Sequence, residues 1–145
     1  MLQEHVERLY LPAVAEYRRR IADGGRVAAV LCAWEDRLRR GWLRLHIGEP
    51  SASQSGNSWL VSVPVYLGDI AADDIGVELY AEPNAGCAAT VAMERRFPAP
   101  GSINGFVYEA GISAARDWRD YTVRIIPAHA GVRAPAELPL ILWQK

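Results

Sequence analysis

Two strand-like runs near the C-terminus constrain the fold more than any other part of this chain. In residues 119–129, Tyr121, Val123 and Ile125 alternate with other side chains, which is the period of a half-buried strand. Residues 138–143 are apolar at nearly every position, and the segment between the two runs contains Pro and Gly. The two runs therefore predict a hairpin of neighbouring strands that closes a β-sandwich.

A second detail of this stretch concerns Asp117, which precedes Tyr121 by four residues. This order is typical of the tyrosine corner of immunoglobulin-like sandwiches, in which the phenol hydroxyl ties a strand to the loop before it. We therefore expect Tyr121 to bind back to the loop that carries Asp117.

The apolar period changes from 3.6 to 2 after Gly41, so residues 41–145 are expected to form a β domain. Residues 51–58 are rich in Ser and predict a polar loop. Short strands with no helical pattern between them are typical of antiparallel sandwiches. The prediction is a mainly β fold, an immunoglobulin-like antiparallel β-sandwich of about seven strands, at residues 42–47, 59–65, 75–79, 89–96, 104–112, 120–126 and 138–143.

Turn-forming residues mark local features of this domain. Pro64 has no N–H to donate, so its strand is expected at a sheet edge or a bulge. Residues 101–105 lack the GxGxxG spacing and are followed by no helical pattern, so they predict a hairpin turn rather than a phosphate-binding loop. Asp73 and Asp74 predict a turn rather than acid–base catalysis, because adjacent strand residues point to opposite faces.

Residues 1–40 have the period of helices and are expected to form a docking segment of two helices. Apolar side chains recur at every third or fourth position in residues 2–21 and again in residues 27–38. Pro12 predicts a kink or a break just before it. The sequence Asp-Gly-Gly at 23–25 predicts the end of the first helix, since Gly readily adopts the left-handed conformation.

Composition excludes several kinds of chemistry. The chain has fifteen Arg and a single Lys, Lys145, so no internal lysine can form a Schiff base with pyridoxal phosphate. The histidines, His5, His46 and His129, are too far apart for a local metal motif. No GxSxG motif and no local signature of a catalytic thiol occur. We expect no catalytic, cofactor-binding or metal-binding residue in this chain.

Charge and the N-terminus bear on the compartment. A net charge of −1 gives no basis for nucleic-acid binding, and the Arg clusters at 18–20 and 37–40 fall at expected helix ends, where cations complement the helix dipole. The N-terminus has acidic residues in place of a secretory signal, and no apolar run is long enough for a membrane helix. A cytoplasmic location is therefore expected, with Cys32 in a helix and Cys87 in a loop as free thiols.

The aromatic residues offer the one candidate site. Trp118, Trp42 and Tyr80 would form a platform for sugar rings if they were exposed on one sheet face. Trp118 is the first choice, because it stands between charged residues in an expected turn. The competing interpretation places most of the aromatic side chains in the core or at a domain interface.

Four sets of residues, in order along the chain, resemble a known family. The sets are 4–13, 33–37 with Trp42, 77–80, and 121–129 with 140–143. Their order and spacing are similar to the C-terminal region of bacterial and archaeal α-glucan (glycogen/maltodextrin) phosphorylases, and the similarity runs nearly from end to end of the chain.

The resemblance implies membership of a pyridoxal-phosphate enzyme that transfers glucose from an α-1,4-glucan to orthophosphate, giving glucose 1-phosphate. In that family the cofactor lysine, the phosphate-binding residues and the glucan cleft lie in two large upstream domains, so none can be assigned to this chain. Residues 2–21 would belong with the last helices of the catalytic domains, and residues 42–145 would be an appended sandwich.

Three functions follow. The first is a non-catalytic accessory domain whose helices dock on the catalytic domains of the parent enzyme, so that the isolated chain self-associates through those helices. The second is an α-glucan-binding module that acts alone or as a tether. The third is a small hydrolase whose catalytic residues converge from distant positions.

Overall fold

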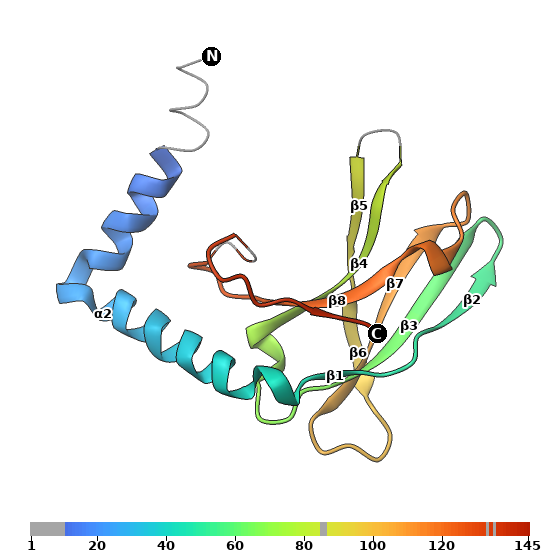
Figure 1. Ribbon diagram of the computed structural model, residues 1–145, viewed down its shortest axis with the longest axis horizontal. Coiled ribbons are helices and arrows are strands. Elements are labelled where there is room, and N and C mark those ends of the chain that lie inside the picture. Colours follow the sequence, from blue (N-terminus) through green and yellow to red (C-terminus); the bar gives the residue numbers. More distant parts are fainter. Residues whose placement is uncertain (1–10, 85–86, 133, 135) are drawn as a thin grey trace. The chain divides into compact units, whose positions relative to one another are not determined.

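The computed structural model describes residues 11–84, 87–132, 134 and 136–145 (Figure 1). The chain divides into two compact units, Met1–Arg37 and Leu38–Lys145, where the sequence placed a boundary between residues 40 and 41. The described residues are mainly β, as predicted, with nine strands in two antiparallel sheets that follow an N-terminal helix.

The N-terminal helix, α2, spans Leu11–Gly41 and contains a break. Residues 23–25 have positive φ values of 55°, 66° and 81°, which no helix continues through. The predicted end of the first helix at the Asp-Gly-Gly sequence is therefore confirmed, and so is the pair of helical segments. The break expected before Pro12 concerns residues 1–10, which lie outside the described residues.

The first sheet carries β3 at its centre. β3 pairs with β7 on one side and with two short strands, β1 and β2, on the other. β7 in turn pairs with β6, as the predicted hairpin turn at 101–105 requires. The bounds are β1 (His46–Ile47), β2 (Ser51–Ser55), β3 (Ser58–Tyr66), β6 (Glu94–Pro98) and β7 (Gly105–Ser113).

The second sheet has the order β5-β4-β8-β9. It contains the predicted closing hairpin, because Arg124 and Ile125 of β8 pair with Trp143 and Leu142 of β9. The strand expected at 138–143 is shorter than predicted, since only residues 142–143 are in β9. Three short 3-10 helices connect or precede strands. The bounds are β4 (Ile75–Asn84), β5 (Cys87–Ala92), β8 (Thr122–Pro127), β9 (Leu142–Trp143), η2 (Trp42–Arg44), η3 (Ala72–Asp74) and η4 (Trp118–Asp120).

The core of the sandwich is made by alternate residues of the central strands. Period-2 alternation turns one set of side chains of each strand inward, and each fully buried Val or Leu adds about 1.5–3 kcal/mol of transfer free energy. These side chains are at most 2% exposed: Val61, Val63 and Val65 of β3, Val77 and Leu79 of β4, and Val123 and Ile125 of β8.

Two segments differ from the prediction at the start of the β domain. Residues 42–47 were expected as one strand, but Trp42–Arg44 is η2 and only His46–Ile47 is β1. Trp42 and Leu45, three residues apart, are buried and Leu43 is 95% exposed, which is the period of a 3-10 turn rather than of a strand. The loop predicted at 51–58 is wrong. Ser51–Ser55 is β2, an exposed edge strand that pairs with β3 through its backbone and therefore needs no apolar alternation.

The segment predicted as one strand at 89–96 is two strands in different sheets. β5 ends at Ala92 and β6 begins at Glu94, and the chain crosses between the sheets at Met93, which is 7% exposed. The same pairing corrects the loop expected at Cys87, whose backbone begins β5. Cys32 is a free thiol on α2.

Pro64 lies on the central strand of its sheet rather than at an edge, so that prediction is wrong. The Gly48 amide donates to the Pro64 carbonyl oxygen at 2.8 Å. The amide and carbonyl of a strand residue point to the same side, so the missing N–H faces the gap between β1 and β2. Proline is tolerated there because the neighbouring edge is interrupted.

The expected tyrosine corner has a different form in this chain. The Asp117 carboxylate accepts a hydrogen bond from the Arg119 amide at 2.9 Å and caps η4. The Tyr121 ring lies 5.4 Å from Cζ of Arg116, and its amide donates to the Trp118 carbonyl. Within the described residues the Tyr121 hydroxyl has no hydrogen-bond partner, so this strand is tied down by its backbone and its ring.

A membrane-spanning helix, which needs both length and a strongly apolar run, does not occur in the described part of the chain.

Candidate functional site

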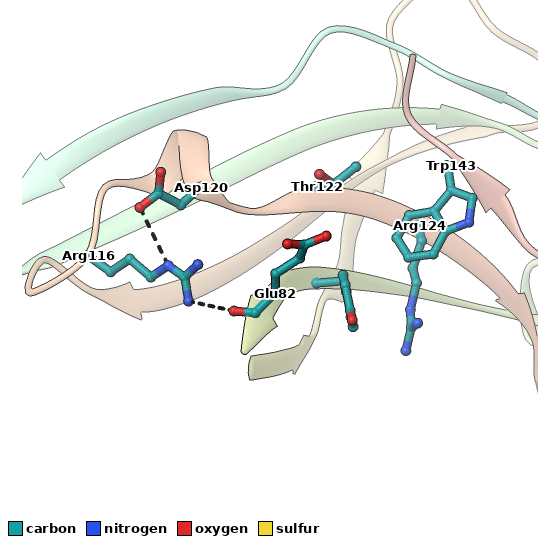
Figure 2. A pocket seen from close by; sticks show the side chains of 7 residues that line it. Glu82, Arg116, Asp120, Thr122, Arg124 and Trp143 are labelled. Atoms are coloured by element: carbon teal, nitrogen blue, oxygen red, sulfur yellow. Dashed lines mark hydrogen bonds and ion pairs between the residues drawn. The ribbon is translucent and has the colours of Figure 1, made fainter. Parts of the chain in front are cut away.

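The outer face of the β5-β4-β8-β9 sheet carries a group of aromatic and charged side chains. Arg124 of β8 is paired in register with Glu78 of β4 and with Trp143 of β9, and Thr122 is paired with Tyr80. These residues alternate with the buried ones, so their side chains leave the core. All of them except Glu78 border an open hollow of about 700 Å³, lined by Tyr80, Glu82, Arg116, Asp120, Thr122, Arg124 and Trp143 (Figure 2).

Arg124 is held at the centre of this face. Its Nε atom donates to Oε2 of Glu78 at 2.9 Å, and its Nη2 atom forms an ion pair with the same oxygen at 2.8 Å. Its Cζ atom lies 4.9 Å from the Tyr80 ring centroid and 5.5 Å from that of Trp143, within the range of cation–π attraction. The two rings contact each other edge to face, with centroids 5.4 Å apart. Arg124 therefore fixes both rings in place.

Arg116 holds the other end of the hollow. Its Nη1 atom donates to the Glu82 carbonyl oxygen at 3.2 Å, and its Nε atom lies 3.5 Å from Oδ2 of Asp120. Figure 2 shows both contacts: the first joins β4 to the segment between β7 and β8, and the second lies within that segment. One hydrogen bond from a charged side chain thereby links two parts of the wall of the hollow.

Several polar groups on this wall have no partner within the described residues. They are the Glu82 carboxylate, the Thr122 and Tyr80 hydroxyls and the Trp143 indole N–H. Neither arginine of the lining is free to bind an anion, since Arg116 pairs with Asp120 and Arg124 pairs with Glu78 beside the hollow. The arrangement offers both hydrogen-bond donors and acceptors next to aromatic surface, without a free cation in the described lining.

The aromatic residues chosen from the sequence have three different environments. Tyr80 lies on β4 and lines the hollow. Trp118 lies on η4, half-buried and outside the lining, with Cζ of Arg119 5.0 Å from its ring centroid. Trp42 is 7% exposed on η2, which leaves too little surface for a stacking platform. The three residues do not form one platform.

Sequence reasoning missed most of the lining. Trp143, which is 41% exposed, was counted only among the aromatic residues, and Arg124 and Glu78 only as parts of longer stretches. The sequence did carry one signal for these residues. Glu78 and Tyr80 on one strand, and Thr122 and Arg124 on the other, alternate with apolar residues and are therefore expected to point away from the core. Three of the stretches that carry the family resemblance, 77–80, 121–129 and 140–143, meet on this face.

The residues present do not fit pyridoxal phosphate, the cofactor that the resemblance implies for the whole enzyme. Lys145 borders a second hollow of about 590 Å³, whose other basic side chain is His46 and whose lining is otherwise mostly apolar. No Arg borders it among the described residues, and Lys145 is exposed at the end of the chain. A phosphate group requires cationic side chains such as arginine, and a Schiff-base lysine requires a desolvated amine. The described lining of this hollow provides neither.

Comparison with known proteins identifies the family. The family model described as the glycogen phosphorylase C-terminal domain matches residues 42–145. No curated protein and no solved structure gave a match. The matched residues cover the whole β domain, so the expected resemblance is confirmed for residues 42–145, and the sets at 4–13 and 33–37 lie outside the match. The chain belongs to the glycogen phosphorylase C-terminal domain family.

Proposed function

We propose that this chain is a non-catalytic, accessory C-terminal domain of a cytoplasmic α-glucan phosphorylase. The parent enzyme would transfer glucose from an α-1,4-glucan to orthophosphate and form glucose 1-phosphate. The observation that carries the proposal is the family match over residues 42–145. The chain itself takes no part in the chemistry, because its one lysine, Lys145, does not fit the cofactor.

The helical segment supports a docking role. On α2, Tyr17 is 65% exposed and Ile21 is 53% exposed, and residues four apart share one helix face. Val30, beyond the break, is 57% exposed. Large apolar side chains that recur on a helix mark a surface that another protein surface covers. In this proposal the catalytic domains of the parent enzyme cover it, and in the isolated chain a second copy does so.

Immunocapture tests the proposal. An antibody raised against this chain is used to capture the native protein from source cells, and the capture is supplied with maltoheptaose, orthophosphate and pyridoxal phosphate. We expect glucose 1-phosphate from the captured protein and none from the purified chain under the same conditions. Formation of glucose 1-phosphate by the purified chain, or an inactive capture that contains folded protein, would contradict the proposal.

A further inference from the structure

We propose that the hollow on the outer face of the β5-β4-β8-β9 sheet is a binding site for a neutral, hydroxyl-rich ligand, an α-1,4-glucan chain. The choice of α-glucan rests on the proposed function. The hydroxyl-rich class rests on the hollow alone.

Charge excludes the main competing ligands. A phosphate or nucleic-acid site needs cations that are free to pair with the ligand. Here Arg124 pairs with Glu78, and Arg116 pairs with Asp120 and a carbonyl oxygen. The Glu82 carboxylate then remains without a cationic partner in the part of the chain that the structure describes, so the hollow disfavours an anionic ligand.

Hydrogen bonding gives the class. The Glu82 carboxylate is an acceptor, the Trp143 indole N–H is a donor, and the Thr122 and Tyr80 hydroxyls are both. None of the four has a partner within the described residues. A sugar hydroxyl also donates and accepts, so a saccharide can satisfy a mixed set of this kind.

Aromatic surface gives the mode of contact. Trp143 is 41% exposed and Tyr80 is half-buried, and each keeps apolar ring surface at the hollow. The planes of the two rings are inclined at 73° to each other. A curved ligand can contact both ring surfaces, whereas a flat ligand cannot. An α-1,4-glucan is curved, whereas its β-1,4 isomer is extended.

Rigidity favours a preformed site. The ion pair of Arg124 with Glu78 is 14% and 19% exposed at its two side chains, and Arg124 contacts both rings. Side chains fixed before binding lose little conformational entropy when the ligand arrives. The site therefore does not depend on a conformational change.

The test is a titration of the folded chain with maltoheptaose, followed by NMR of the indole N–H signals of its five tryptophans. The signal of Trp143 is assigned with W143F. We expect this signal to shift saturably at millimolar maltoheptaose, with smaller shifts for Trp118 and the other three. Cellohexaose and orthophosphate serve as the β-linked and anionic controls and are expected to leave the spectrum unchanged.

Variants define the site. T122V removes one hydroxyl at nearly constant shape, and W143A removes the ring; each is expected to weaken binding by about tenfold or more. W118F, outside the lining, is the matched control and should bind as the parent chain does. If W143A does not fold, T122V carries the test.

Three results would overturn the proposal. They are an unchanged Trp143 signal at millimolar maltoheptaose, equal binding by T122V and the parent chain, and saturable binding of orthophosphate at this face. The titration uses only the purified chain, so its failure leaves the immunocapture result untouched, and the two proposals can fail separately.

Discussion

Arg124 and Glu78 stand directly opposite each other on β8 and β4, and a single carboxylate oxygen of Glu78 lies 2.9 Å from Nε and 2.8 Å from Nη2 of Arg124. The same guanidinium group contacts the rings of Tyr80 and Trp143. One cross-strand pair thus organises the outer face of the sheet, and its removal affects both stability and the shape of the hollow.

E78Q should destabilise the chain by about 1–3 kcal/mol, because the mostly buried guanidinium group of Arg124 keeps its charge but loses the carboxylate that pairs with it. Urea unfolding followed by circular dichroism measures the change. D69N, which breaks the exposed ion pair of Arg44 and Asp69, is the control and should change stability by no more than about 1 kcal/mol. Equal losses in the two variants would show that burial adds nothing to the Arg124–Glu78 pair.

Y108F should leave the free energy of unfolding at neutral pH unchanged or raise it by up to about 1–3 kcal/mol. The Tyr108 side chain is 4% exposed, and its hydroxyl has no partner in the described part of the chain, so the substitution removes an unsatisfied polar group without opening a cavity. A loss of more than about 1 kcal/mol in chemical unfolding would indicate a hydrogen bond to this hydroxyl.

Tyr108 also predicts a dependence on alkaline pH. Burial raises the pKa of its phenol above 10.0, with a smaller opposing effect of Arg95 and a smaller supporting effect of Asp73. The folded chain then holds this proton more tightly than the unfolded chain, so the contribution of Tyr108 is complete below about pH 10 and declines as the pH rises above it. The decline should be weaker in Y108F. Identical stability profiles above pH 10 for both proteins would rule this contribution out.

The helix surface predicts self-association of the isolated chain. Tyr17 and Ile21 present adjacent apolar side chains on α2, and a double substitution, Tyr17→Ser with Ile21→Ser, should shift the chain toward monomer in sedimentation velocity. Leu60→Ser, at a 44% exposed position on β3, is the control and should leave the association unchanged. A parent chain that stays monomeric at all concentrations would contradict the docking role of the helices.

The fold was largely predictable because the spacing of apolar residues and the positions of turn-forming residues indicate most of its helices and strands. The Asp-Gly-Gly break, the alternation in β3, β4 and β8, and the closing hairpin all follow from local residues. The errors fall where backbone pairing outweighs side-chain pattern. β2 is held by β3 despite its run of serines, and Pro64 is accepted on a central strand because the neighbouring edge is interrupted.

The candidate site was less predictable because it depends on register. Glu78, Arg124 and Trp143 are far apart in sequence and meet only because β4, β8 and β9 pair with one particular alignment. A shift of one residue would turn these side chains into the core. The exposure of a tryptophan could not be predicted either, since only the fold buries Trp42, on η2, and leaves Trp143, on β9, 41% exposed.

The central claim is that this chain is part of a larger phosphorylase, and the mass of the native protein tests it most directly. Extracts of source cells are separated under denaturing conditions and probed with the antibody, with the purified 16.0 kDa chain as the marker. We predict a band several times larger than the marker, which carries the catalytic domains in the same polypeptide. A single band at 16.0 kDa would contradict the account and leave a freestanding glucan-binding protein as the leading function.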